Sequence, residues 1–135
     1  MSKPLMVHVI TNFAGVGGAE MMLARLIQCT EQQYKHVIIA LMKTSEVYQS
    51  TLDRCQAHYA LDWNGINTLG TVSKLRTLLK KLQPATVQCW MYHANVLTSL
   101  SIIGLAQKPK VVWGIHHSLA SPKDESISTK IALAL

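Results

Sequence analysis

Short apolar runs alternate along the chain with longer amphipathic stretches, and this alternation constrains the fold most. The expected strands lie at 5–10, 36–42, 57–61, 85–90 and 110–115, and the expected helices at 18–29, 46–54, 71–82 and 94–106. Short apolar runs between helices are typical of strands that are buried on both faces, as in parallel sheets. The sequence therefore predicts an α/β fold, a Rossmann-like parallel sheet flanked by helices, in one domain over residues 1–135.

A glycine-rich turn, Asn12 to Glu20, joins the first expected strand to the first expected helix. Glycine lets a ligand approach the backbone closely, and a helix N-terminus presents free N–H groups and partial positive charge. Gly17 and Gly18 are therefore candidate ligands of a phosphate, although they could also serve only as a tight connection. The spacing matches neither the dinucleotide fingerprint nor a P-loop. We expect Glu20 to be a first-turn acid that stabilises the helix.

Composition limits the partners and the compartment. The formal net charge of +6 suits an anionic partner, whether nucleotide, anionic lipid or nucleic acid, but no nucleic-acid-binding motif is present. Neither a signal peptide nor a membrane-spanning apolar stretch is visible. Cys29, Cys55 and Cys89 form no pair motif, so we expect buried thiols in a reducing, cytoplasmic compartment.

Two further segments follow expected strands, Trp90 to Asn95 and Trp113 to Ser118. Parallel strands end at one edge of the sheet, where ligands bind in α/β folds. We therefore expect both segments to share a rim with the glycine turn. Neither segment has the acid or cysteine partners that a metal site requires, so no metal is expected.

Other histidines and tryptophans have structural explanations. His8 lies within an expected strand and His36 at the start of one, so we expect both to be structural. We expect Trp90 and Trp113 to contribute packing rather than ligand stacking.

Three segments together resemble the N-terminal domain of a family 4 glycosyltransferase of the GT-B fold. They are the glycine turn after His8-Val9-Ile10, the segment Trp90 to Asn95, and the segment Trp113 to Ser118. The resemblance covers nearly the whole chain. Such enzymes have two Rossmann-like domains facing a cleft. They transfer a sugar from a nucleotide-sugar with retention, usually without a metal or other cofactor, as in polysaccharide biosynthesis.

The resemblance also implies roles for individual residues. Gly17 and Gly18 would lie at the donor diphosphate, and His116 or His117 beside the transferred sugar. His93 and Asn95 would line the side of a glycan or lipid-linked acceptor. Because such acceptors are often membrane-linked, peripheral contact with the inner face of the membrane is implied. The basic residues of the 71–82 helix could make that contact or simply form a solvated face; they are Lys74, Arg76, Lys80 and Lys81.

The chain departs from the family in one large respect. The nucleotide-binding C-terminal domain and its pair of glutamates eight positions apart are absent. Residues 128–135 resemble an apolar helix without a stop signal, so we expect a chain cut short near its C-terminus. We expect the isolated fragment to be inactive. The alternative function is a non-catalytic Rossmann-like module, or inactive remnant, that binds an anion or nucleotide.

Overall fold

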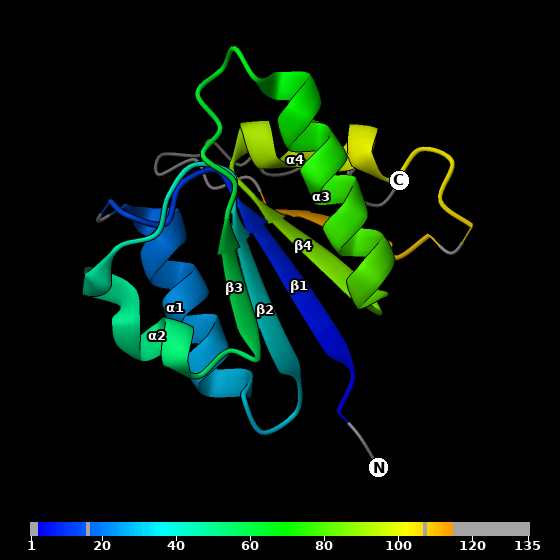
Figure 1. Ribbon diagram of the computed structural model, residues 1–135. Helices are drawn as coiled ribbons and strands as arrows, with labels where there is room; N and C mark the ends of the chain where they lie inside the picture. The colour runs from blue at the N-terminus through cyan, green and yellow to red at the C-terminus, as the bar shows by residue number, and fades with distance from the viewer. Residues whose placement is uncertain (1–2, 16, 107, 115–135) are drawn as a thin grey trace, which may run out of the picture.

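The computed structural model describes residues 3–15, 17–106 and 108–114. Their strands form one all-parallel, five-stranded sheet in the order β3-β2-β1-β4-β5 (Figure 1). The strands are β1 (Leu5–Ile10), β2 (Lys35–Ala40), β3 (Ala57–Ala60), β4 (Thr86–Trp90) and β5 (Lys110–Gly114). The helices are α1 (Gly18–Thr30), the 3₁₀ turn η1 (Glu46–Tyr48), α2 (Gln49–Asp53), α3 (Thr68–Leu82) and α4 (Tyr92–Ser101). The predicted α/β fold with a Rossmann-like sheet is confirmed.

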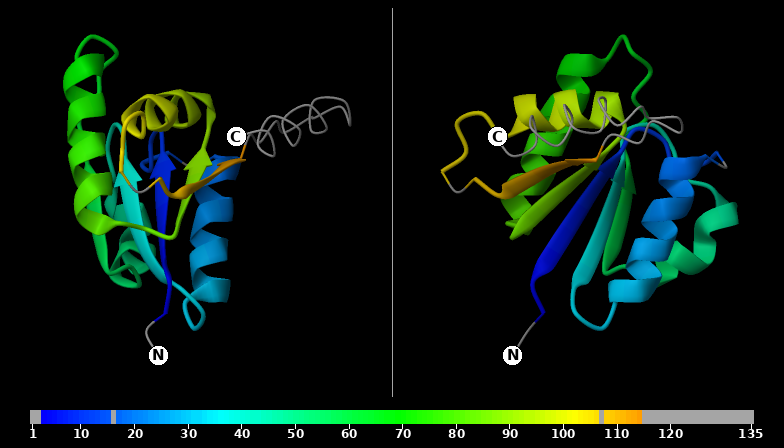
Figure 2. Two further views of the ribbon diagram at one scale, coloured as in Figure 1. Left: turned by 90° about the vertical axis from the view of Figure 1, so that its right-hand side faces the viewer. Right: turned by 180° about the vertical axis from the view of Figure 1, so that it is seen from behind.

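The sheet is buried on both faces because successive side chains of a strand point to opposite sides. In β1, Val7 and Val9 pack with α3 and α4, whereas Ile10 packs with α1 and α2. Figure 2 shows the sheet between these two layers, with α1 on one side and α3 and α4 on the other. The apolar runs predicted from the sequence are therefore explained by two separate cores.

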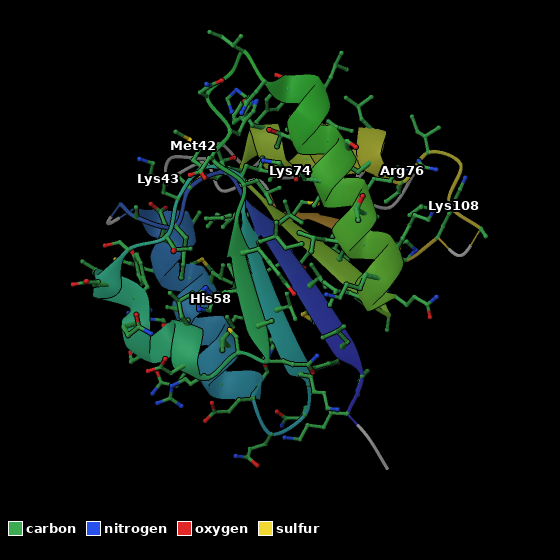
Figure 3. The ribbon with its side chains drawn as sticks, viewed as in Figure 1. Met42, Lys43, His58, Lys74, Arg76 and Lys108 are labelled. Carbon is green, nitrogen blue, oxygen red and sulfur yellow. The ribbon has the colours of Figure 1, made fainter. Side chains whose placement is uncertain are left out.

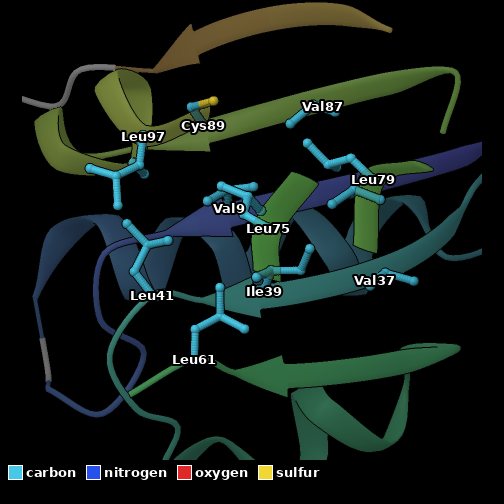
Figure 4. Packing of buried hydrophobic residues seen from close by; sticks show 12 residues of the cluster. Val9, Val37, Ile39, Leu41, Leu61, Leu75, Leu79, Val87, Cys89 and Leu97 are labelled. Atoms are coloured by element: carbon cyan, nitrogen blue, oxygen red, sulfur yellow. The ribbon is translucent and has the colours of Figure 1, made fainter. Parts of the chain in front are cut away.

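The core beneath α3 contains side chains from three central strands. Leu75 and Leu79 of α3 are almost fully buried and belong to one cluster with Val9, Val37 and Ile39 (Figure 4). Burying a side chain of this size contributes about 1.5–3 kcal/mol relative to leaving it exposed. This packing fixes the helix that follows β3 across the middle of the sheet.

The predicted helices at 46–54 and 94–106 differ most from the structure. The stretch 46–54 is a 3₁₀ turn followed by the short helix α2, and the helix expected at 94–106 runs from Tyr92 to Ser101. The guanidinium of Arg76 in α3 donates hydrogen bonds to the carbonyls of Ser101 and Ile103, and Gly104 has a φ of +79° (Figure 3). These contacts end α4 early. Arg76 therefore joins α3 to α4, unlike the exposed Lys74, Lys80 and Lys81.

The cysteines differ in exposure. Burial raises the pKa values of Cys55 and Cys89 to about 12. Cys29 is exposed, so the prediction of three buried thiols is wrong at this position. Cys29 follows the buried Ile27 by two residues, and a helix turns about 100° per residue, so its side chain is directed away from the core. None of the described helices has the length and hydropathy needed to cross a bilayer.

Replacing Gln83 with glycine should stabilise the fold. Gln83 ends α3 in the left-handed region, with φ 46° and ψ 57°, which is costly for a residue with a Cβ atom. We expect Gln83→Gly to raise the free energy of unfolding by about 1 kcal/mol, measured by urea denaturation. Gln33→Gly is the control, because Gln33 is exposed but lacks a positive φ. Equal effects of the two substitutions would contradict this account.

Candidate functional site

The carboxyl ends of β1 and β4 define the candidate site. These strands are neighbours, but the chain leaves β1 for α1 on one face of the sheet and leaves β4 for α4 on the other. In open α/β sheets, ligands bind beyond the carboxyl ends of the strands at such a point of divergence. We use "the rim" for the segments that follow the strands at this edge: 11–20, 41–44, 61–67 and 91–95.

At the glycine turn, a buried acid folds back over the backbone. Glu20 is 5% exposed. A Cβ atom added to Gly17 would lie 2.7 Å from its Oε1, and one added to Gly15 would lie 3.1 Å from its Oε2. The Tyr48 hydroxyl donates a 2.6 Å hydrogen bond to the Gly15 carbonyl and holds the turn. Gly15 and Gly17 are therefore required by Glu20 itself, whereas Gly18 faces open space.

The predicted first-turn position of Glu20 is confirmed. Its carboxylate lies where the partial positive charge at the start of α1 stabilises it. Burial, together with the Glu20 charge, also raises the pKa of the Tyr48 hydroxyl. Oε1 of Glu20 has no hydrogen-bond partner in the described part of the chain. A phosphate could therefore approach Gly18 directly, but at Gly17 it would have to displace Glu20.

The second part of the rim is the start of α4. Met91 precedes the helix with a strained φ of +78°. His93 is exposed, as is Tyr92, whose ring centroid lies 5.8 Å from that of His93. Asn95 is fully buried, and neither atom of its amide group has a hydrogen-bond partner within the described residues. Of the two residues predicted to line the acceptor side, His93 therefore faces solvent and Asn95 is enclosed.

Most residues whose buried polar atoms lack a partner in the described part of the chain lie at this edge of the sheet; Thr98, further along α4, is the exception. Thr11 follows β1, Glu20 lies in the first turn of α1, and Thr71 and Asn95 lie near the starts of α3 and α4. Most buried polar atoms in folded proteins have a hydrogen-bond partner. This edge therefore has unused donors and acceptors that a polar ligand or ordered water can satisfy.

The sequence analysis did not include Trp63. It follows β3, and its indole ring lies 5.2 Å from the His93 ring, centroid to centroid. Its Nε1 donates a hydrogen bond to Thr68 at the start of α3. The turn-forming run from Asp62 to Gly65 after an expected strand was the signal that could have identified this loop. With Met42 and Lys43 after β2 (Figure 3), the rim receives residues from four strands.

The predicted histidine pair, His116 and His117, lies outside the described residues, as does the side chain of Trp113. The strand before the pair is described: Gly114, the last residue of β5, is in register with Trp90 of β4. Two of the three predicted segments therefore start from neighbouring strand ends. Within the described residues, no group of three or more His, Cys, Asp or Glu side chains could hold a metal ion.

His8 and His36 form a buried polar chain on the α1 side of the sheet. Trp90 Nε1 donates to His8 Nδ1 at 3.2 Å, so the hydrogen of neutral His8 is on Nε2, 2.9 Å from His36 Nδ1. His36 must then donate from Nε2 to the Thr30 hydroxyl, which donates to the Leu26 carbonyl at 2.6 Å. This chain fixes both tautomers. The structural interpretation of both histidines, and of Trp90 as a packing residue, is confirmed.

Comparisons with known proteins do not assign this chain to a family. No protein-family model matches this chain, and no curated protein is significantly similar to it in sequence. The function must therefore be argued from the rim itself.

The buried histidines should make the fold acid-sensitive. Burial, and secondarily the charge of His36, lowers the pKa of His8 to about 3. Burial also lowers the pKa of His36, against the opposing effects of the Thr30 hydrogen bond and the Glu31 charge. The unfolded chain therefore binds more protons below pH 6.5. The free energy of unfolding should fall from there toward pH 3, by up to about 1.4 kcal/mol per pH unit for each histidine.

Chemical denaturation at a series of pH values measures this slope. His8→Leu should be less stable at pH 7, because it removes two buried hydrogen bonds, one from the Trp90 N–H and one to His36, and its pH profile should be flatter. His58→Gln, at an exposed histidine, should keep the profile of the unmodified protein. A His8→Leu profile as steep as the original would refute the explanation.

Replacing Asn95 with leucine should stabilise the fold. A buried amide without a partner, as the Asn95 amide is among the described residues, costs about 1–3 kcal/mol, and leucine has a similar size without that cost. We expect Asn95→Leu to raise the free energy of unfolding by about 1 kcal/mol. In the control Asn67→Leu, lost bonds to the Asn64 N–H and the Asp62 carbonyl should lower it. A strongly destabilised Asn95→Leu variant would show that the amide is structural.

Proposed function

We propose that this chain is the acceptor-side half of a retaining glycosyltransferase, which transfers a sugar from a nucleotide-sugar to a glycan or lipid-linked acceptor. The observation that carries the proposal is Asn95 in the first turns of α4, a buried amide whose two polar atoms have no hydrogen-bond partner among the described residues. An amide can both donate to and accept from a sugar hydroxyl. The resemblance in three segments, given above, supplies the reaction class.

The glycine turn would act on the leaving group. When the bond between the sugar and the diphosphate breaks, negative charge develops on the phosphate. The Gly18 N–H, with the dipole of α1 behind it, would stabilise that charge, and the structure leaves space for the approach. The acceptor oxygen forms the new glycosidic bond as the bond from the sugar to the diphosphate breaks, and the hydroxyl proton passes to the leaving phosphate. His116 or His117 would orient the sugar.

The rest of the donor site would come from a second domain. By the resemblance, a C-terminal Rossmann-like domain binds the nucleotide across the cleft. A lipid-linked acceptor would be met at the inner face of the cytoplasmic membrane. Exposed lysines on α3 would suit anionic headgroups there; they are Lys74, Lys80 and Lys81.

A second candidate function is a non-catalytic module with weak affinity for anions. It is favoured by the carboxylate of Glu20, which covers Gly17 and would repel a phosphate there. The two functions differ in turnover. Transfer of labelled sugar from a panel of nucleotide-sugars to free and lipid-linked glycans, assayed with and without the C-terminal domain, distinguishes them. Transfer by the two-domain protein alone supports the proposal. Transfer by residues 1–135 alone contradicts the requirement for a second domain. No transfer in either case favours the non-catalytic anion-binding module.

Gly18→Ala is the sharpest test of the phosphate role. No atom lies within 4 Å of the position of its new Cβ, so the fold should be unchanged or slightly more stable. A methyl group there would nevertheless hinder a phosphate. In the two-domain protein we expect the transfer rate to fall roughly tenfold to a thousandfold, with equal thermal stability. Full activity of Gly18→Ala would show that the turn is only a connection.

A further inference from the structure

An apolar groove runs between α1 and the end of β4, on the face of the sheet opposite α3 and α4. Its volume is about 340 Å³, and it is lined by Met22, Arg25, Leu26, Cys29 and Trp90. Met22 of α1 is 49% exposed, and Leu26 is half-buried. The apolar stripe of α1 is therefore wider than the part that the sheet covers.

The sheet beside this groove is uncovered as well. Seen from behind (Figure 2, right), α1 lies in front of the sheet, but no described helix lies in front of β5. Gln88 and Val112 are in register on this face, and both are only half-buried. Strands of parallel sheets are ordinarily covered on both faces. The groove and the neighbouring β4–β5 surface thus both lack a described cover.

We propose that the segment 119–135 of this same chain docks on the groove between α1 and β4. The first argument is position. β5 ends at Gly114, in register with Trp90, and Trp90 lines the groove. The last residue of β5 is therefore in register with a residue of the groove, and residues 115–135 follow it in the sequence. A tethered segment also needs far less intrinsic affinity than a separate partner, because its effective concentration is high.

The second argument is chemical complementarity. Ile127, Ile131 and Leu135 recur every four residues, a spacing that forms one apolar face in a helix. They match a groove made mainly of methionine, leucine and tryptophan side chains. Asp124 and Glu125 precede this run, and Arg25 is the charged residue lining the groove. The segment thus has an apolar face that can pack in the groove and two carboxylates that can pair with Arg25.

The docked segment would have a consequence for the rim. It would anchor the chain on both sides of residues 115–118, because β5 holds one end and the groove the other. The predicted histidine pair would then be held at the carboxyl edge of the sheet, near the starts of α1 and α4. The inference does not depend on the sugar-transfer chemistry.

Cys29 provides a built-in reporter for the test. Among the described cysteines it is the exposed one, and it lines the groove; Cys55 and Cys89 have pKa values raised to about 12 and should react slowly. The rate of Cys29 alkylation by N-ethylmaleimide is measured on the full chain by mass spectrometry. A combined Ile127→Gln, Ile131→Gln and Leu135→Gln variant should react about tenfold faster or more, corresponding to loss of about 1.4 kcal/mol of docking free energy.

The groove side has a matched pair of variants. Met22→Gln should also raise the Cys29 rate, whereas Met21→Gln should not, because Met21 is equally exposed but does not line the groove. Glutamine adds no charge that would alter the thiol. All rates are measured at two protein concentrations. Rates unchanged by both sets of substitutions overturn the proposal. Protection that disappears on dilution overturns it in favour of a second copy of the chain.

Discussion

The pairing of β1 with β4 is the interaction on which the rest of this structure depends. It joins residues separated by about eighty positions and reverses the direction in which the sheet grows, since β2 and β3 add on one side and β4 and β5 on the other. A parallel strand must be reached by a crossover, and α3 provides it by packing Leu75 and Leu79 over the central strands. Without that crossover the glycine turn and the start of α4 would not share an edge.

The same pairing concentrates unsatisfied polar groups where the two connections diverge. On the α1 side of the sheet, buried polar side chains are paired in the chain from Trp90 through His8 and His36 to Thr30. At the rim, Asn95 and Glu20 are enclosed with atoms that have no described partner. The histidines and these two residues are all buried, so they differ in their hydrogen-bond partners and not in their exposure. The two buried histidines therefore have hydrogen-bond partners, whereas most buried polar atoms without a described partner lie at one edge of the sheet.

Glu20 changes how the glycine turn can be understood. Close approach to the backbone was expected to serve a ligand, but at Gly15 and Gly17 the approaching atoms belong to the protein's own carboxylate. Only Gly18 combines a helix N-terminal position with open space. A short glycine motif can therefore contain both structural and ligand-accessible glycines, and their backbone surroundings distinguish them.

The sequence by itself determined the alternation of strands and helices, the parallel sheet, the place of the glycine turn, and the buried positions of His8, His36 and Trp90. These follow from local periodicity and from the one-dimensional order of apolar residues. Only the tertiary structure decided that α4 ends early, where Arg76 of α3 binds the carbonyls that follow it, and that Trp63 contacts His93. It also decided that Cys29 and Met22 are exposed, and that the Asn95 amide has no partner among the described residues. Each of these depends on which residues distant in sequence meet across the sheet, and periodicity carries no information about a hydrogen-bond partner several elements away.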